Sequence, residues 1–205
     1  MRFISHHDSM RMFERALART GLPVRFSEGF NPRPKLSLPL PRPVGMASMA
    51  DVLVIELSEP VAVEEIVKIL ADQLPQGVTL LEAWELGSTR PPQPMSASYA
   101  LEVPRDRVAG VQERLDQVLA AEQWPIHRDE PNSPRKTLDL REQLVAASIS
   151  IEDAGVGRLL WTLQVVPSGS IRPTELLMTL GLEPAEFQHR IVRTAIEWPP
   201  GAVKG

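Results

Sequence analysis

Cationic side chains recur at helical spacing near the start of the chain. His7, Arg11, Arg15 and Arg19 follow one another at intervals of four residues, which would place them along one face of a helix. Arginines in such a row attract anions, so Arg11 and Arg15 are candidate phosphate contacts. Charged faces are also common on ordinary helices, and Glu14 is available for local pairing. The row alone therefore does not identify a binding surface.

The next segment, Phe26 to Lys35, combines cations with a restricted backbone. Pro32 and Pro34 fix their own backbone angles, and each proline also pushes the residue before it towards an extended conformation. A loop that presents side chains to a ligand benefits from losing its conformational entropy in advance. The strongest phosphate candidates of the chain are therefore Arg33 and Lys35.

Other side chains of this loop could serve either ligand binding or structure. Asn31 could contact a base or a sugar, and Gly29 with the two prolines would form a rigid turn. A base could stack on Phe26 or Phe30. Burial of both rings beneath the loop is the stronger expectation, because aromatic side chains more often serve a core.

The run Ser5-His6-His7-Asp8 holds the residue types of a catalytic triad. Neighbours on one helical turn point in different directions, so they cannot form the hydrogen-bond relay that a triad requires. Ser5 is expected to cap a helix, and Asp8 to support that cap and the positive helix end. His6 could contact a bound polyanion or substrate. No metal site is predicted, because the other histidines, His127 and His189, lack ligand spacing.

Charge and composition narrow the function classes. The chain carries a formal net charge of −4, yet residues 1–45 hold eight basic against three acidic residues, a net +5 that leaves −9 for the remainder. This asymmetry suggests a phosphate-bearing partner. The absence of cysteine excludes thiol nucleophiles and thiolate-bound iron–sulfur clusters from these 205 residues. The sequence shows no phosphate-binding or dinucleotide fingerprint, no membrane-spanning stretch and no signal peptide, and a cytoplasmic location is expected.

Hydrophobic periodicity predicts the elements that would position these residues. A helix is expected over 6–20, with Met10, Phe13 and Leu17 as its buried stripe. The first half should also contain strands over 24–27, 36–40, 51–57 and 78–85 and a helix over 61–74. The second half should contain strands over 99–103, 123–128, 144–151, 158–166 and 188–198, helices over 105–122 and 173–180, and a loop over 129–134.

The proline-rich segment 87–98 is the predicted domain boundary. The predicted domains are a basic unit over 1–88 and a second unit over 97–205. The similar order of strands and helices in the two halves favours an α+β fold made of two ferredoxin-like α/β sandwich subdomains with mainly antiparallel sheets. Arg141 and Arg172 of the second half could extend the basic surface, although a turn and a helix start also account for residues 168–175.

Several motifs together resemble a known family. They are Phe3 to His6, Asp8, Met10-Arg11, Glu14 to Leu17, Gly21 to Pro23, Ser27, Gly29 to Lys35 and Pro43 to Gly45. In these residues the chain resembles the radical SAM-linked family of uncharacterised bacterial domains, which occur fused to or beside B12-binding-type radical SAM proteins. One departure is Val54, which stands where the resemblance leads us to expect an acidic residue.

The resemblance implies a radical SAM protein as partner. That partner, and not this cysteine-free chain, would hold the iron–sulfur cluster, SAM and cobalamin. The leading hypothesis is a non-catalytic accessory module that binds RNA, tRNA or rRNA, and presents it to the modification enzyme. An alternative is a protein docking module without nucleic acid. A third is an independent enzyme with His6, Asp8 and Lys35 around a pocket.

Overall fold

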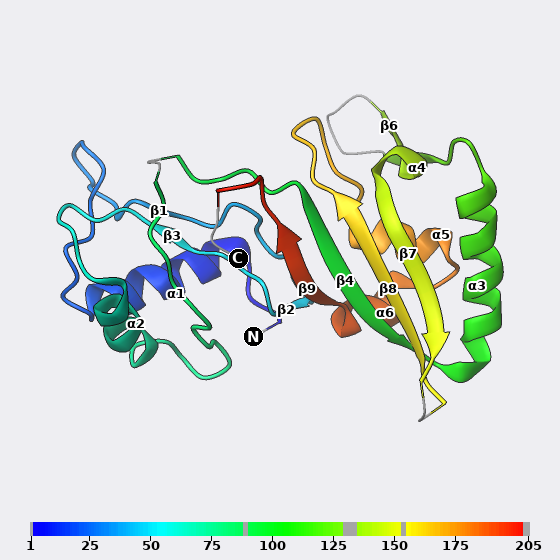
Figure 1. Cartoon of the computed structure of the whole chain (residues 1–205), viewed down its shortest axis with the longest axis horizontal. Coiled ribbons are helices and arrows are strands. Elements are labelled where there is room, and N and C mark those ends of the chain that lie inside the picture. The colour runs from blue at the N-terminus through cyan, green and yellow to red at the C-terminus, as the bar shows by residue number, and fades with distance from the viewer. Residues whose placement is uncertain (1, 88–89, 129–134, 153–154, 203–205) are drawn as a thin grey trace. The chain divides into compact units, whose positions relative to one another are not determined.

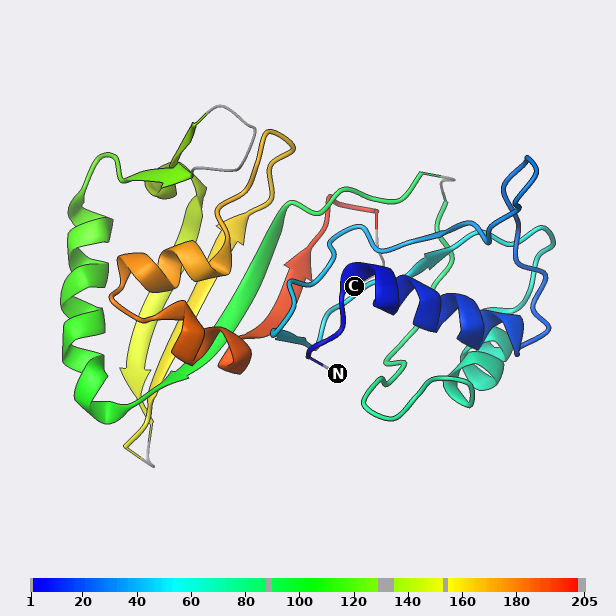
Figure 2. The same cartoon turned by 180° about the vertical axis from the view of Figure 1, so that it is seen from behind.

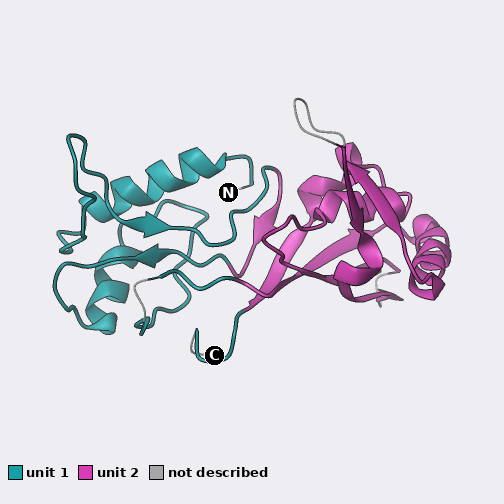
Figure 3. Cartoon of the chain, turned by 90° about the horizontal axis from the view of Figure 1, so that it is seen from above, with its two compact units in different colours: residues 1–44, 51–93, 198–205 teal, residues 45–50, 94–197 magenta. Residues whose placement is uncertain are grey.

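A computed structural model describes residues 2–87, 90–128, 135–152 and 155–202 of the chain. The chain forms two compact units (Figure 3). Unit 1 comprises residues 1–44, 51–93 and 198–205, and unit 2 comprises residues 45–50 and 94–197. Residues 45–50 thus belong to the second unit, whereas the sequence analysis placed them in the first.

The main sheet of unit 2 has five strands in the order β2-β9-β4-β8-β7. Its antiparallel strands are β4 (Ser96–Val103), β7 (Leu144–Ile151), β8 (Gly157–Gln164) and β9 (Val192–Glu197). Helix α3 (Arg105–Ala120) follows β4, and α5 (Pro173–Thr179) precedes β9. This β-α-β-β-α-β order is ferredoxin-like. The prediction of an α+β fold with mainly antiparallel sheets is confirmed.

Three further features complete unit 2. The two-residue strand β2 (Ala47–Ser48) pairs in parallel with β9. A hairpin of β5 (Pro125–Arg128) and β6 (Lys136–Asp139) precedes the short helix α4 (Leu140–Gln143). Helix α6 (Pro184–Phe187) is followed by a 3₁₀ turn over Gln188–Arg190, which occupies the first three residues of the strand predicted over 188–198.

The core of unit 2 lies on one face of this sheet. Every second side chain of strand β8 is buried and those between are exposed or half-buried, as a sheet with one covered face requires. Tyr99 and Trp161, on neighbouring strands, stack with ring centroids 5.5 Å apart. Helix α3 adds buried side chains at intervals of three and four residues: Val108, Val111, Leu115 and Val118. Helices α5 and α6 lie behind the strands in Figure 1 and in front of them in Figure 2.

Unit 1 is built around α1 (His6–Ala18) and α2 (Val63–Ala71). Ala16, Leu17 and Leu70 form its buried cluster, against which partly buried side chains pack: Leu22, Val24, Leu36, Ile55, Leu74 and Leu80. The predicted stripe on α1 is therefore only partly correct, because Met10 and Phe13 are half-buried and Ala16 is buried instead.

The strands of unit 1 are much shorter than the sequence suggests. β1 (Leu36–Ser37) pairs antiparallel with β3 (Val54–Ile55) in a two-stranded sheet. Residues 78–85 form no strand, although their composition predicts one. Prolines at positions 39, 41 and 43 remove backbone donors shortly after β1, so β1 cannot be extended as a regular strand. The predicted loop over 129–134 lies outside the described residues.

Candidate functional site

Ser5 begins helix α1 as its N-cap. The Ser5 hydroxyl oxygen accepts a hydrogen bond from the backbone N–H of Asp8 at 3.1 Å and donates one to the Asp8 carboxylate at 2.7 Å. This hydrogen bond from Ser5 holds the pKa of Asp8 below its ordinary value, and the charges of Arg11 and His7 act in the same direction. The His6 and His7 rings are exposed, with centroids 6.5 Å apart. Ser5 and Asp8 are thus occupied with capping.

Arg11 and Arg15 of α1 and the C-cap residue Arg19 differ in the contacts that they make. Arg19 donates to the side-chain oxygen of Gln73 at 3.0 Å and to the Gln73 carbonyl at 2.7 Å, and so ties α1 to the end of α2. Arg15 donates to the Arg11 carbonyl at 3.3 Å. Arg11 and Arg15 are exposed, and neither forms an ion pair with a carboxylate in the part of the chain that the structure describes. They remain available to an external anion.

Three short segments of unit 1 meet in a ring of backbone hydrogen bonds. Arg25 donates to the Glu56 carbonyl at 2.8 Å, Glu56 donates to the Lys35 carbonyl at 3.0 Å, and Lys35 donates to the Arg25 carbonyl at 2.7 Å. Each segment therefore bonds to both of the others. The ring fixes the base of the loop that runs from Arg25 to Lys35.

The side chains of the same three residues form ion pairs. Glu56 contacts Arg25 at 2.7 Å and Lys35 at 3.5 Å. Lys35, one of the predicted phosphate contacts, is thus partly neutralised within its own unit. Glu56 is not among the predicted site residues, although it lies two residues after Val54, at the next position on the same side of an extended chain. Arg42 is likewise paired, with Asp51 at 3.0 Å.

The loop above this ring is a hairpin. Phe26 forms a bridge with Pro34, the Ser27 N–H donates to the Arg33 carbonyl at 2.8 Å, and the Arg33 N–H donates to the Ser27 hydroxyl at 3.0 Å. Gly29 has a φ of 124°, which an L residue rarely adopts. We call residues 27–33 the hairpin tip. The segment projects from unit 1 in both Figure 1 and Figure 2.

Both phenylalanines of this hairpin contradict the expectation of burial. Phe30 is 106% exposed and Phe26 is 53% exposed. The reason is that the tip extends past the small core of unit 1, so no apolar surface lies beneath it. Asn31 and Arg33 are exposed beside Phe30. The Arg33 side chain forms no ion pair with any described carboxylate.

The two candidates from the second half of the chain lie in unit 2. Arg141 is half-buried in α4, and its Nε donates to the Ala121 carbonyl at 3.2 Å. Arg172 is exposed at the start of α5, where its backbone N–H donates to the Glu175 carboxylate at 2.7 Å. Both residues thus have local structural contacts within unit 2.

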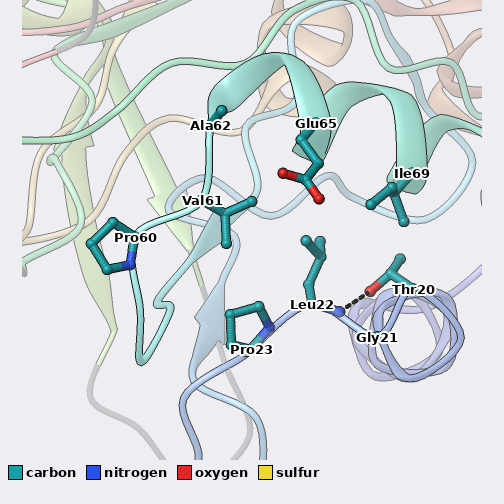
Figure 4. A pocket seen from close by; sticks show the side chains of 9 residues that line it. All are labelled: Thr20, Gly21, Leu22, Pro23, Pro60, Val61, Ala62, Glu65 and Ile69. Atoms are coloured by element: carbon teal, nitrogen blue, oxygen red, sulfur yellow. Dashed lines mark hydrogen bonds between the residues drawn. The ribbon is translucent and has the colours of Figure 1, made fainter.

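A shallow pocket of about 210 Å³ lies between the end of α1 and the start of α2 (Figure 4). Its lining combines apolar side chains with polar groups: the Glu65 carboxylate lies on one side, and the Leu22 N–H donates to the Thr20 hydroxyl at 3.1 Å. The volume is below the range typical of ligand sites. None of His6, Asp8 and Lys35, the residues of the enzyme alternative, lines it.

The described ranges, 2–87, 90–128, 135–152 and 155–202, lack two other kinds of feature. These ranges contain no group of three or more His, Asp or Glu side chains arranged to hold a metal ion. They also contain no helix with the length and apolar character needed to cross a bilayer.

The fold and the candidate site define an α+β protein that exposes cations on one helix and an aromatic side chain at the tip of a hairpin. The chain belongs to the family described as "Uncharacterized protein conserved in bacteria (DUF2344)", which matches residues 1–173. The match includes α1, the hairpin and most of unit 2. A comparison with curated proteins finds no match.

Proposed function

We propose that this chain is a cytoplasmic, non-catalytic accessory module that binds RNA, tRNA or rRNA, and presents it to a radical SAM modification enzyme. The observation that carries the proposal is that Arg11, Arg15 and Arg33 of unit 1 are exposed and form no ion pair with a described carboxylate. Phosphate groups are the anions that such a set would meet along an RNA backbone.

The ion pairs of unit 1 indicate which cations remain available to RNA. Glu56 and Asp51 engage Arg25, Lys35 and Arg42, so much of the positive charge of residues 1–45 is compensated inside the unit. Exposed pairs of this kind add little stability. The uncompensated arginines are therefore the better candidates for RNA contacts, and Lys35 is a weaker candidate than its sequence position suggested.

The chemistry of radical SAM proteins indicates which cofactors the proposed partner would hold. Such enzymes bind their cluster through thiolates, and these 205 residues contain no cysteine. The cluster, SAM and cobalamin would accordingly sit in the partner, which the sequence resemblance suggests.

The direct test is binding of total small RNA to the full chain at two salt concentrations, measured by fluorescence anisotropy. We expect the double variant Arg11→Ala, Arg15→Ala to weaken binding at low salt and to reduce the salt slope by about 2, because two phosphate contacts are lost. Arg33→Ala should reduce the slope by about 1. Lys35→Ala is the matched control, and it should have a smaller effect because Glu56 already engages this lysine.

Absent or salt-insensitive RNA binding would contradict the proposal.

The second candidate, a docking module for the radical SAM partner, is favoured by the exposed Phe30 and Phe26 side chains. Co-purification of the partner from a nuclease-treated lysate, lost in Phe30→Ala and retained in the double arginine variant, would support docking instead of RNA binding.

A further inference from the structure

Phe30 contributes nothing to the core of either unit. Its side chain is as exposed as in an extended chain, at 106%, while the buried cluster of unit 1 is formed by other residues, Ala16, Leu17 and Leu70. Packing within the described chain therefore does not account for an aromatic residue at this position. A ligand that uses the ring face would account for it.

The backbone that carries Phe30 is held on both sides. The paired hydrogen bonds between Ser27 and Arg33 close the tip, and the ring of Arg25, Lys35 and Glu56 fixes its base. Pro32 and Pro34 limit the returning segment. A ligand that binds here pays little entropy for ordering the loop, which favours recognition of a small and defined chemical group.

The side chains at the tip combine three complementary chemistries. A phenylalanine face can stack on a nucleobase, an asparagine amide can pair with a base edge, and a guanidinium can contact the adjoining phosphate. Base faces are accessible only where nucleotides are unpaired, as in loops, bulges and single strands. Phe30, Asn31 and Arg33 provide these groups within four residues, all exposed.

A protein pocket is a weaker explanation for the same tip. Protein hot spots centre on an anchor surrounded by contacts that exclude water. The residues next to Phe30 in the sequence, Gly29 and Asn31, are exposed and not apolar, and the exposed apolar residues Pro32 and Phe26 of the same hairpin lie two and four residues away. Stacking on a base needs only one ring and no apolar surround.

We infer that the hairpin tip selects an unpaired nucleotide, with its base stacked on Phe30, its edge read by Asn31 and its phosphate contacted by Arg33. The inference rests on the RNA-binding function proposed above and deepens it. It distinguishes the hairpin, which would read single-stranded RNA, from the α1 arginines, which would contact any RNA backbone.

The experiment compares binding of a 12-nucleotide single-stranded RNA and of its blunt duplex to the full chain. A 2-aminopurine base in the single strand reports stacking through quenching of its fluorescence. We expect tighter binding of the single strand, and Phe30→Ala should weaken that binding about 10-fold while duplex binding stays unchanged. Phe30→Trp should retain affinity and quenching, whereas Phe30→Leu, which is apolar without a ring, should behave like Phe30→Ala.

The outcomes separate the two proposals. If the wild-type chain binds neither RNA, both the RNA-binding function and this inference fail. If Arg11→Ala with Arg15→Ala weakens binding but Phe30→Ala does not, the function stands and the nucleotide inference fails. If Phe30→Leu keeps its affinity for the single strand, stacking on the ring is wrong. If Phe30→Ala loses a co-purified protein but binds RNA as before, the hairpin tip is a protein docking site. Because Phe30 is exposed, unchanged circular dichroism is expected for every variant.

Discussion

Arginine has two different roles in this chain, and its surroundings decide which. Arg11 and Arg33 are exposed without a carboxylate partner among the described residues, whereas Arg128 is 12% exposed and forms two 2.7 Å hydrogen bonds to Glu175. Glu175 also accepts a 2.7 Å hydrogen bond from the Arg172 N–H. Burial alone would raise the pKa of Glu175, but the hydrogen bonds and charges of Arg128 and Arg172 outweigh burial and lower it. Arg128 is thus a structural arginine of unit 2.

Replacing Glu175 should lower the free energy of unfolding of unit 2 and make that free energy depend less on pH. Because the folded-state pKa is lowered, the stabilisation is complete above the ordinary glutamate value and is lost as pH falls through the folded-state value. Glu175→Gln removes the carboxylate that accepts two hydrogen bonds from the largely buried Arg128, so we expect a loss of about 3 kcal/mol at neutral pH. Urea unfolding between pH 3 and 7 measures both effects. An identical pH dependence in variant and wild type would contradict the assignment.

The contact between helix α3 and strand β8 explains why glycine starts that strand. A Cβ atom on Gly157 would overlap the Val108 side chain of α3 and lie 3.2 Å from the Val103 carbonyl. Gly157 therefore allows a close approach of helix and sheet. Gly110, in the middle of the same helix, has open space around the position of a Cβ atom.

Two alanine substitutions should consequently act in opposite directions. Gly157→Ala overpacks the junction of α3 with β8, and we expect a destabilisation of about 2 kcal/mol. Gly110→Ala removes backbone freedom from a helix interior and should stabilise by about 0.5 to 1 kcal/mol. Chemical unfolding curves of the two variants provide the measurement. A neutral or stabilising Gly157→Ala would show that the helix shifts without cost.

At the scale of the whole molecule, the two units are interleaved along the chain. The chain passes from unit 1 to unit 2 at residue 45, and residues 45–50 contribute β2 to the sheet of unit 2. Residues 51–93 then belong to unit 1 again. Met46 in the segment 45–50 is 2% exposed, and Met49, three residues later, is 66% exposed. The segment is therefore packed into unit 2 and is not a simple linker.

Truncating Met46 should destabilise unit 2, although Met46 precedes most of that unit by about fifty residues. Met46→Ala leaves a cavity beside β9, with an expected cost of about 3 kcal/mol. Hydrogen exchange at amides of β4 and β9 should become faster. Met49→Ala is the matched control and should change exchange there little, since its side chain is exposed. Equal effects of the two substitutions would contradict the placement of β2.

Local patterns in the sequence were sufficient for features that neighbouring residues control. They predicted α1 with its Ser5 cap, α3, the strands β4, β7 and β8 and the excess of cations near the start, because periodicity, capping and composition act over a few residues. Only tertiary structure decided which cations are compensated, because Glu56 and Asp51 reach Arg25, Lys35 and Arg42 from another segment. It likewise decided the exposure of Phe30 and the parallel pairing of β2, since burial and strand pairing depend on residues far apart in the chain.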